Sequence, residues 1–489
     1  MNVVPDLLER FPAARPALLE LTGEGGRRIW HFGELIAQSA GLSGAFAARG
    51  VERGDAVMTL CGSRLEWVLA MLACWRMGAV AMPCSTQLRA GDLETRAAAA
   101  NPVLCVGEAE LLGALPGGIE VMDMAEVERV LDEDLDQETP AAVADLDPDD
   151  PALIIFTSGT TGAARPALHG QSYIPGQMLQ AEHWLGAGPG DLVWCTAAPG
   201  WSKSSRNVFL APWLRGAAGV VHDARFEASE RLEICRREGI SILCQAPTEY
   251  RMLAKRTEVG RLPEMHRMVA AGEALGTEVG AHFLERTGLA IADGYGQTET
   301  GQITGWRPGE KPVSGSMGRA LPGIETRITA EGELQVRAAS VPTFFLGYLD
   351  EDGPARLIDG EWWATGDFAT AREDGALVYA GRGDDIISSS GYRIGPAEVE
   401  SALASHPDVA EAGAIGIDDP ERGQIVKAFV VLRSGEPGEE LTAALLAHAR
   451  AETAPYKAPR AIEFIDELPK TATGKLRRVA LRELEARGS

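Results

Sequence analysis

No stretch of this sequence stays apolar for long enough to cross a membrane. The longest apolar run covers residues 67–75 and is flanked by Arg64, Glu66 and Arg76, whereas a membrane-spanning helix needs about 20 residues. We therefore interpret the run as a buried helix. The N-terminal segment also lacks a basic lead followed by an apolar core, so no signal peptide is predicted. Both absences favour a cytoplasmic location.

Cysteines in a CxxC spacing are also absent. The chain has seven cysteines, an odd number, and most of them lie inside apolar segments. Paired extracellular disulfides and zinc sites normally leave recognisable spacings, and reduced thiols are the rule inside cells. We expect these cysteines to be reduced thiols of the core.

Basic residues are few relative to acidic ones. The 46 Lys and Arg stand against 70 Asp and Glu, which gives a formal net charge of −24. Nucleic acid and anionic membrane surfaces repel such a chain at long range. We therefore expect neither as a partner, whereas an anionic small molecule remains possible where a site supplies its own donors.

The sequence has the length and pattern of a layered α/β protein. Its 489 residues, 45% of them apolar, are enough for two or three structural units. Residues 33–112 alternate helical apolar periods with short apolar runs at 56–61 and 79–83, a pattern typical of strands and helices in layers. Residues 132–151 concentrate acid and proline, which predicts an exposed loop.

The pattern changes near residue 384 to that of a compact α+β unit. We predict a large domain over residues 1–383 and a small mobile domain over residues 384–489. In chain order, the small domain should contain a strand at 386–389, a helix from Pro396 with Val399, Ala402 and Leu403 on one face, strands at 409–417 and 427–432, a helix at 441–452 and a strand at 461–465.

A loop rich in hydroxyl groups and glycine is the strongest single feature. It follows a strand-like run at 152–156, and its backbone N–H groups and hydroxyls can converge on an oxyanion such as phosphate. No GK[ST] closes the loop, so it is not a Walker sequence, and a surface turn of this composition is common. The candidate phosphate ligands are Thr157, Ser158, Gly159, Thr160, Thr161 and Gly162.

Further segments, in matching order, resemble motifs of the acyl-adenylate-forming superfamily. The loop at 157–162 is similar to the phosphate loop of that family, GYGQTET at 294–300 to its second signature, and WATGD at 363–367 to its ribose-binding motif. GRGDD at 381–385 and SGYRI at 390–394 resemble the hinge and acceptor-binding region of that family, and PKTATGK at 469–475 resembles its catalytic lysine motif. The resemblance spans about residues 30 to 485.

Within the superfamily, the chain is most similar to medium-chain acyl-CoA synthetases. Segments 198–204, 211–217 and 246–253 carry that likeness. The resemblance implies an AMP-forming acid–CoA ligase that uses ATP, Mg²⁺ and coenzyme A. Such an enzyme activates a carboxylic acid to its acyl-AMP with release of pyrophosphate, and a homodimer is a plausible assembly.

The resemblance also assigns catalytic roles. Glu299 would hold a magnesium ion that bridges phosphate oxygens, and Thr298 belongs to the same motif. Lys475 would swing in to bridge carboxylate and phosphate during adenylation, and Arg382 would contact ribose or phosphate. The plainer alternatives are a solvated loop acid for Glu299 and a tail lysine in solvent for Lys475.

Nucleotide binding would involve several segments. Asp367 would accept hydrogen bonds from both ribose hydroxyls, with a surface aspartate as the alternative. A turn after the strand at 268–271 would contact adenine, unless it is a plain turn. The remaining candidate nucleotide ligands are Arg165, Gly272, Glu273, Ala274, Asp293, Gly294, Tyr295 and Gln297, and Asp384 would be the hinge about which Gly391 and Arg393 come to face coenzyme A.

Two positions bear on the acid. Acetate-activating relatives carry a tryptophan where this chain has Gly296, so an aliphatic or aromatic acid larger than acetate is expected, and Gly296→Trp should exclude it. Trp201 resembles a residue near the acyl pocket, although a buried core tryptophan fits equally well. The chain departs from the family at Ala164 and Arg165, which replace the usual proline and lysine and exchange an ammonium for a planar guanidinium.

Two other functions stay open on the sequence alone. The first is adenylation with another acceptor or anion: an amine, a carrier-protein thiol, or nitrite in diazotisation. The second is a catalytically silent nucleotide-binding scaffold, which the presence of Glu299, Asp367, Arg382 and Lys475 disfavours. Pyrophosphate exchange without thioester formation would identify the first.

Overall fold

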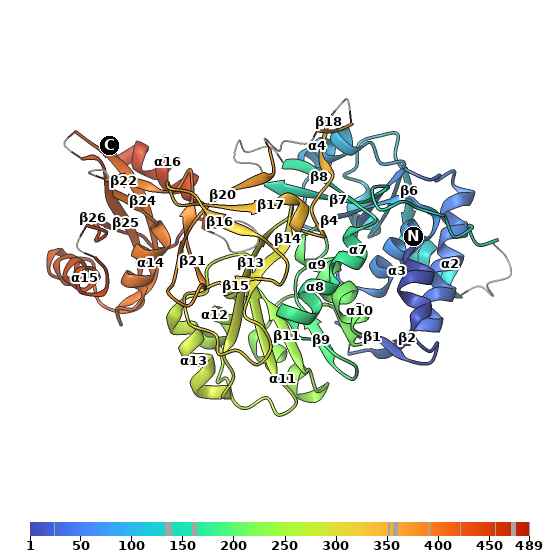
Figure 1. Ribbon diagram of the computed structural model, residues 1–489, viewed down its shortest axis with the longest axis horizontal. Coiled ribbons are helices and arrows are strands. Elements are labelled where there is room, and N and C mark those ends of the chain that lie inside the picture. Colours follow the sequence, from blue (N-terminus) through green and yellow to red (C-terminus); the bar gives the residue numbers. More distant parts are fainter. Residues whose placement is uncertain are drawn as a thin grey trace.

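Two large sheets sandwich a layer of helices, and a small α+β domain lies at one end of the long axis (Figure 1). The computed structural model describes residues 1–23, 25–132, 139–158, 164–350, 353–355, 360–389, 392–420, 422–454, 456–470 and 476–488. The expected α/β fold, with a large layered domain followed by a small α+β domain, is confirmed.

The nine-stranded sheet is mainly parallel, and its parallel strands end at one common edge. In spatial order, its strands are β15 (Arg319–Ala320), β14 (Gly301–Gly305), β13 (Ile291–Gln297), β12 (Arg267–Ala271), β11 (Ile242–Gln245), β9 (Leu192–Cys195), β10 (Ala218–Asp223), β1 (Pro16–Thr22) and β2 (Arg27–His31). Ligands of open parallel sheets bind outside the carboxyl ends of the strands, so this edge is where a site is expected.

The eight-stranded sheet combines a parallel half with an antiparallel half. In spatial order, its strands are β19 (Gly353–Ala355), β18 (Gly347–Asp350), β8 (Ala164–Gly170), β7 (Pro151–Ser158), β4 (Val80–Cys84), β3 (Ala56–Leu60), β5 (Leu104–Gly107) and β6 (Glu120–Asp123). The runs at 56–61 and 79–83 are therefore strands, as predicted.

Helices fill the core between the two sheets. Strand β12 shows the layering, because Val269 and Ala271 face this core whereas Met268 and Ala270 face the core on the other side of the sheet. The helices of the inner layer are α1 (Val3–Asp6), η1 (Leu8–Arg10), α2 (Phe32–Ala48), α3 (Leu65–Met77), α6 (Met124–Asp132), α7 (Tyr173–Gly176), α8 (Met178–Gln180), η2 (Ala181–Leu185), α9 (Lys203–Ser205), η3 (Arg206–Leu210) and α10 (Ala211–Leu214).

Outer helices cover the opposite faces of both sheets. The helices α11 (Ala228–Arg237), α12 (Pro247–Arg256) and α13 (Thr277–Thr287) pack on the nine-stranded sheet, at the bottom of Figure 1. The helices α4 (Ala90–Ala100) and α5 (Ala109–Leu112) pack on the eight-stranded sheet. The large domain is therefore layered helix, sheet, helix, sheet, helix.

A third, four-stranded sheet lies between the large sheets and the small domain (Figure 1). Its strands are antiparallel, and a short helix, η4 (Ala338–Ser340), follows its second strand. In spatial order, the strands are β16 (Thr326–Ile328), β17 (Glu333–Arg337), β20 (Trp362–Ala371) and β21 (Leu377–Arg382).

The small domain contains every element expected from the sequence and two that were not. Its helix α14 (Pro396–Ala404) buries Val399, Ala402 and Leu403, as its apolar spacing predicted. The unexpected elements are strand β23 (Tyr392–Ile394) and helix α16 (Arg478–Gly488). The other elements are β22 (Ile387–Ser389), β24 (Val409–Asp419), β25 (Gly423–Leu432), α15 (Glu439–Glu452) and β26 (Ala461–Phe464).

Several local predictions can be compared with the fold. The apolar run at 67–75 lies in α3 and is fully buried. Of the acidic segment predicted as a loop at 132–151, Asp132 ends α6 and Pro151 begins β7, and residues 139–150 contain no helix or strand. All seven cysteines are free and buried. Within the described ranges, no helix combines the length and apolarity that a membrane crossing requires.

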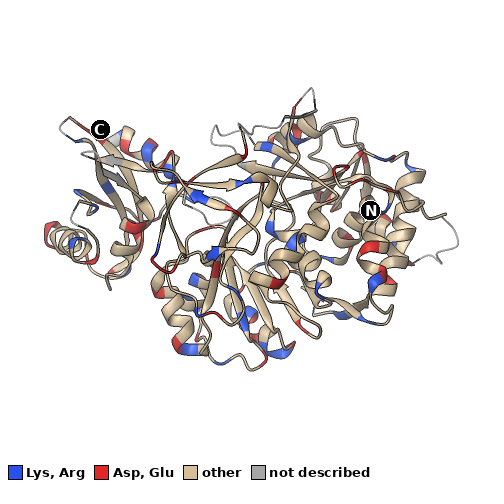
Figure 2. Ribbon diagram, in the orientation of Figure 1, with Lys and Arg blue, Asp and Glu red and all other residues tan. Residues whose placement is uncertain are grey.

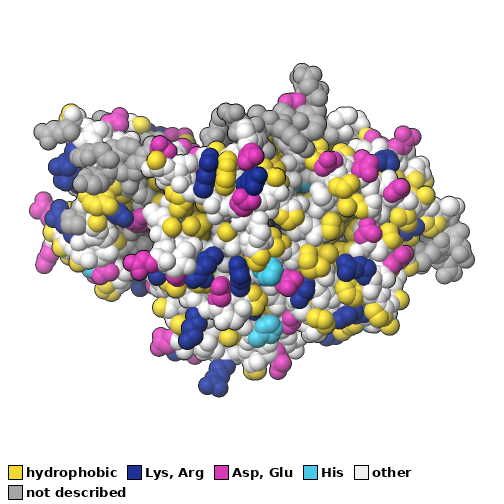
Figure 3. All heavy atoms as spheres, viewed as in Figure 1, with side chains coloured by type: hydrophobic (Ala, Val, Ile, Leu, Met, Phe, Trp, Pro, Cys, Tyr) yellow, Lys and Arg dark blue, Asp and Glu magenta, His cyan; other side chains and the backbone are white. Residues whose placement is uncertain are grey.

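Charged residues are spread over the whole molecule. Figure 2 shows acidic and basic residues on both domains. On the face seen in Figure 3, side chains of both charges alternate with polar and apolar ones. On this face the charges are therefore dispersed and form no single acidic patch.

Candidate active site

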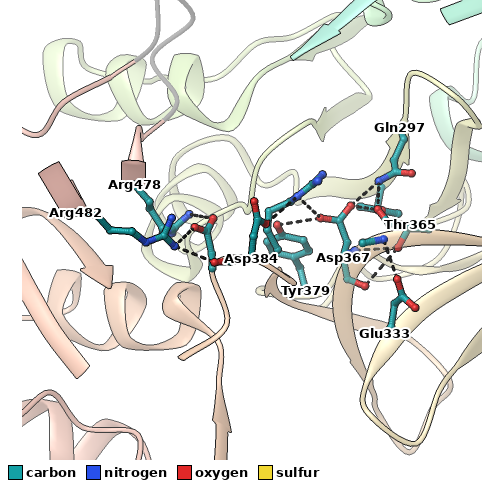
Figure 4. A network of polar contacts seen from close by, with 12 residues as sticks. Gln297, Glu333, Thr365, Asp367, Tyr379, Asp384, Arg478 and Arg482 are labelled. Atoms are coloured by element: carbon teal, nitrogen blue, oxygen red, sulfur yellow. Dashed lines mark hydrogen bonds and ion pairs between the residues drawn. The ribbon is translucent and has the colours of Figure 1, made fainter. Parts of the chain in front are cut away.

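A buried carboxylate, Asp367, lies where the nine-stranded sheet meets the four-stranded sheet (Figure 4). Its Oδ2 accepts hydrogen bonds from the Tyr295 hydroxyl at 2.5 Å and from Gln297 Nε2 at 2.7 Å. Its Oδ1 has longer contacts, 3.4 Å to the Tyr379 hydroxyl and 3.6 Å to Arg382 Nε. Because only 4% of Asp367 is exposed, the alternative of a surface aspartate is wrong.

Burial raises the pKa of Asp367, and Arg382 and the three donors act in the opposite direction. The donors come from strands β13 and β21, on either side of the carboxylate. Gln297 is itself fixed, because Nε2 also donates to the Thr365 carbonyl at 2.7 Å and Oε1 accepts from Trp363 Nε1 at 3.1 Å. The structure thus brings two predicted segments, 294–300 and 363–367, into direct contact.

A chain of charged groups leads from this carboxylate to the small domain (Figure 4). Arg382 Nε lies 3.6 Å from Asp367 Oδ1 and 3.7 Å from Asp384 Oδ1. The next residue, Asp385, pairs with Arg482 at 2.7 Å and with Arg478 at 3.4 Å. Both arginines belong to α16, so this helix holds the segment that follows the predicted hinge residue.

A second buried carboxylate, Glu299, lies in the turn between β13 and β14. Its Oε1 accepts a hydrogen bond from the Tyr348 hydroxyl, and burial together with Glu299 raises the pKa of this tyrosine, which keeps it a donor. The guanidinium of Arg165 lies 3.6 Å from the centre of the Tyr348 ring. Because Glu299 is 9% exposed, the alternative of a solvated loop acid is wrong.

A cavity of about 520 Å³ lies beside Tyr348 and Arg165. Strand β7 brings Thr157 opposite Arg165 in the register of the β7–β8 pair. The structure therefore brings Arg165 and Glu299 to one tyrosine, with Thr157 opposite Arg165 in the sheet. The lining of the cavity also includes Arg327, Gln335, Glu361, Trp362, Trp363 and Ala364.

The predicted adenine segment begins where β12 ends. Gly272 has a positive φ of 104°, a conformation that favours glycine, and Lys203 Nζ donates to the preceding carbonyl, that of Ala271, at 2.5 Å. Glu273 accepts from the Thr248 N–H at 2.9 Å, and Ala274 is exposed. On the adjacent strand β13, burial raises the pKa of Asp293 to about 8.

Not all predicted site residues can be compared with the structure. Thr298 is half-buried in the β13–β14 turn, and Gly294 lies on β13 within contact distance of Trp184. Arg393 lies on β23, where its side chain is not described, as is also true of Ser158 at the end of β7. The predicted residues outside the described ranges are Gly159, Thr160, Thr161, Gly162, Gly391 and Lys475.

The structure bears on two predictions about the acyl pocket, those for Trp201 and Gly296. Trp201 is 38% exposed, so the alternative of a buried core tryptophan is wrong. A Cβ added at Gly296 would lie 1.9 Å from the Gly301 carbonyl oxygen. The absent side chain at 296 therefore accommodates the neighbouring backbone of β14, which the sequence did not indicate.

Comparison with known proteins adds to this geometry. The family model "AMP-binding enzyme" matches residues 6–349, and the model of the C-terminal domain of AMP-binding enzymes matches residues 398–475. The chain belongs to the AMP-binding enzyme family. Its identity is 37% to YtcI, an uncharacterised acyl-CoA ligase of Bacillus subtilis, over 99% of this chain and 96% of that protein.

Two further relatives of this AMP-binding enzyme cover nearly all of it. The mitochondrial acyl-coenzyme A synthetase ACSM4 of Rattus norvegicus is 36% identical over 96% of this chain and 87% of its own length. The crystal structure of the anthranilate CoA ligase AuaEII in complex with anthranoyl-AMP superposes with a TM-score of 0.88 at 29% identity, covering 99% of this chain and 97% of that one. By homology, the protein is an AMP-forming acyl-CoA ligase, a family that uses ATP and coenzyme A.

Several residues that the sequence did not indicate shape the site of this AMP-binding enzyme. Tyr348 and Tyr379 contact the two buried carboxylates, and Arg478 with Arg482 fixes Asp385. None of these residues lies in a segment that resembles a motif of the family. Lys203 is different, because it lies inside the quoted segment 198–204, and as the one charged residue of that segment it was a usable signal.

Proposed function

We propose that this ligase activates a carboxylic acid larger than acetate with ATP, forming acyl-AMP and pyrophosphate, and then transfers the acyl group to coenzyme A. The observation that carries the proposal is the buried Asp367 carboxylate, held by Tyr295 and Gln297 within 3.6 Å of Arg382. The size of the acid is supported by AuaEII, a relative whose acid is anthranilate.

The reaction joins two anions, since a carboxylate oxygen attacks the α-phosphorus while pyrophosphate leaves. Cationic groups and donors must disperse the added charge. We assign this role to Arg382 and Lys475, with Arg165 and residues 157–162 on the leaving phosphates. Tyr348 supports the last assignment, because its ring contacts Arg165 and its hydroxyl contacts Glu299.

The nucleoside would lie against Asp367. Its Oδ2 already accepts two short hydrogen bonds, whereas Oδ1 has contacts of only 3.4 Å and 3.6 Å, so Oδ1 is the oxygen available to a ribose hydroxyl. The adenine would contact the turn at 272–274 and the buried Asp293. At neutral pH this carboxyl is protonated, since burial raises its pKa to about 8, and a neutral group suits an uncharged base.

Glu299 fits the role of magnesium ligand. Tyr348 engages Oε1 and leaves Oε2 available, and Mg²⁺ is commonly held by one or two carboxylates together with substrate phosphates. Among the described side chains, no group of three or more potential ligands forms a site for a metal ion by itself, which agrees with an ion that arrives with ATP. When bound, Mg²⁺ would neutralise charge on the phosphates.

For the second half-reaction we propose that residues 384–489 rotate about Asp384, bringing Gly391 and Arg393 to coenzyme A. The contact of α16 with Asp385 supports this division, because α16 and β22 then move as one unit. The names of the relatives favour coenzyme A over an amine, a carrier protein or nitrite as the second substrate.

The test of the function is pyrophosphate release over a panel of carboxylic acids, with and without coenzyme A, followed by identification of the product. We expect acid-dependent release and an acyl-CoA thioester. Release without a thioester would instead identify the alternative of another acceptor. Release with no acid at all would contradict adenylation.

Lys475→Ala tests the division of labour between the half-reactions. Loss of its charge should abolish acid-dependent pyrophosphate release, while thioester formation from supplied acyl-AMP stays largely intact. Lys470→Ala is the matched control, because Lys470 lies on the same segment but pairs with Glu411 at 2.6 Å. Equal loss of both half-reactions in Lys475→Ala would contradict the rotating-domain proposal.

A further inference from the structure

An arginine that forms no ion pair with a described residue lies in the inner helical layer of the large domain. Arg206 is the first residue of η3, which joins α9 to α10 at the centre of the molecule (Figure 1). Only 2% of the residue is exposed. The helical turn is of the π type, a rare geometry that occurs often at functional sites.

Among the residues that the structure describes, none compensates the charge of Arg206. Its Nε and Nη1 are buried without a hydrogen bond, and no carboxylate of the described residues forms an ion pair with it. The groups that act on its charge are Tyr173, Cys244 and Cys195, all of them normally neutral. A guanidinium stays protonated in proteins, so this is an unpaired buried cation, which is strongly unfavourable.

Other buried and half-buried arginines show how this protein normally satisfies such a group. Arg267 donates from Nε and Nη2 to the Trp184 carbonyl at 2.9 Å and 2.7 Å, and also to the Trp306 carbonyl. Arg231 pairs with Glu249 at 3.2 Å, and Arg478 pairs with Glu400 at 2.6 Å. Arg206 is thus an exception among comparable residues of the described chain.

The surroundings of Arg206 are polar and only partly satisfied. Neither the ring nitrogens of His169 nor the hydroxyl of Tyr173 form a hydrogen bond of normal geometry, although the backbones of Thr298 and Thr343 and the Ser202 side chain lie close enough to act on them. The two rings lie 4.5 Å apart. Burial and Arg206 lower the pKa of His169 to about 3, so its imidazole is neutral. The group therefore offers one positive charge and hydrogen-bond donors, which together suit an anion.

This cluster adjoins the proposed active site. A Cβ on Gly301 would lie 3.5 Å from Arg206 Nη1, and Gly301 pairs with Gln297, the residue that binds Asp367. The nucleotide phosphates are assigned to the other group, around Arg165 and Tyr348, and Arg206 contacts neither. An anion at Arg206 is therefore best explained as part of the acid.

We propose that the acid activated by this ligase carries a second anionic group, such as a second carboxylate, which binds Arg206 beside His169 and Tyr173. The inference rests on the proposed function, since it defines the class of acid that the same site accepts. The second carboxylate replaces the missing counter-ion of Arg206, so diacids bind and monoacids of the same length leave the cation unpaired.

The test compares linear dicarboxylic acids with monocarboxylic acids in which a methyl group replaces the second carboxylate. With ATP and the wild-type protein, kcat/KM for pyrophosphate release should favour the best diacid by about 100-fold or more. Because this comparison uses only the wild-type protein, it does not depend on whether a variant folds. Equal rates for the two series, or release only from aromatic acids with a single carboxylate, would overturn the inference while leaving the proposed function intact, whereas release from no acid of the whole panel would overturn the proposed function itself.

Arg206→Met removes the charge and keeps a long apolar side chain. The variant should lose about 100-fold in kcat/KM on diacids and keep or improve its activity on monoacids. A diacid without ATP should raise the thermal midpoint of the wild type and leave that of Arg206→Met unchanged. An equal loss on both series would instead mean that Arg206 holds the reacting carboxylate, and would overturn the inference.

Arg267→Met is the matched control, because it removes a buried arginine whose donors are satisfied. It should lower the thermal midpoint by leaving the Trp184 and Trp306 carbonyls unpaired, with the diacid preference unchanged. Arg206→Met should keep or raise the midpoint, since it deletes an uncompensated charge. A change of acid preference in Arg267→Met as large as in Arg206→Met would overturn the assignment to Arg206.

Discussion

At the scale of single residues, burial sets the protonation of the carboxyl groups in the site. Asp293 is buried on β13 and accepts a hydrogen bond from the Gly294 N–H at 2.9 Å. Burial raises its pKa to about 8, Glu273 acts in the same direction, and Lys203 opposes it. The folded protein therefore keeps a proton on Asp293 at neutral pH.

This proton makes stability depend on pH. The folded pKa of about 8 lies above the ordinary value of about 3.9, so the folded state binds more protons between these values and stability falls as pH rises through this range. Asp293→Asn removes the titration and keeps a carbonyl acceptor for Gly294. Scanning calorimetry from about pH 5 to about pH 8 should show the thermal midpoint of the wild type falling relative to that of the variant.

The control for this experiment is Asp418→Asn, at an exposed aspartate of the small domain. Its midpoint should run parallel to that of the wild type at every pH. Parallel curves for Asp293→Asn as well would mean that Asp293 is already ionised in the folded protein, contrary to the expected effect of burial.

The motifs named the carboxylates of the site and only some of the residues that hold them: Tyr295 and Gln297, which bind Asp367, lie in the motif at 294–300, whereas Tyr348 lies in none. Glu299 and Asp367 stand in short segments that the sequence displays directly. Tyr348, which binds Glu299, follows it by 49 residues along the chain, and Arg478, which binds Asp385, follows it by 93. Such contacts depend on how distant strands and helices pack, which no local pattern encodes. Arg206 was missed for another reason, because an arginine is ordinarily a surface residue.

At the scale of elements, the β13–β14 hairpin leaves no space for a side chain at Gly296. The two strands shift register between Tyr295 and Gly296, and a Cβ at 296 would lie 1.9 Å from the Gly301 carbonyl oxygen and 2.8 Å from Gln302 Cα. Contacts this short with backbone require the hairpin itself to move. The size of the acid is therefore not the only property that a side chain at 296 would change.

Gly296→Ala should lower the thermal midpoint and reduce pyrophosphate release on every acid, because the displaced hairpin carries both Gln297 and Glu299. Pyrophosphate release over the acid panel, together with thermal unfolding, measures both effects. Gly91→Ala in α4 is the control, since nothing lies within 4 Å of its added Cβ, and it should be neutral or slightly stabilising. Loss confined to the larger acids would restore the interpretation that Gly296 opens the pocket.

Elements with a strong periodic signal were predictable, and others were not. The helices α3 and α14 repeat apolar residues on their buried sides, so their positions followed from the sequence. Strand β23 is three residues long and exists through its pairing with β22. Helix α16 is rich in charge, and two of its arginines bind Asp385 and Glu400, contacts that no local pattern indicates.

At the scale of the whole molecule, the negative net charge of the protein repels its anionic ligands. ATP, coenzyme A and a dicarboxylic acid are all anions, and the protein carries a formal charge of −24. The cations assigned to the site, Arg165, Arg382 and Arg206, act over short distances inside it. Beyond the site entrance an approaching anion meets the dispersed excess of acidic side chains, so its long-range interaction with the protein is repulsive.

Salt should therefore accelerate binding in the low range of ionic strength. The Debye length falls from about 30 Å at 0.01 M to about 8 Å at 0.15 M, which screens the distant acids before it reaches the arginines of the site. Stopped-flow association of a fluorescent ATP analogue should become faster over this range, and binding of uncharged adenosine should not change. A rate that falls with salt from the lowest concentration would show instead that the arginines dominate the field at the entrance, and that the net charge has no part in selecting ligands.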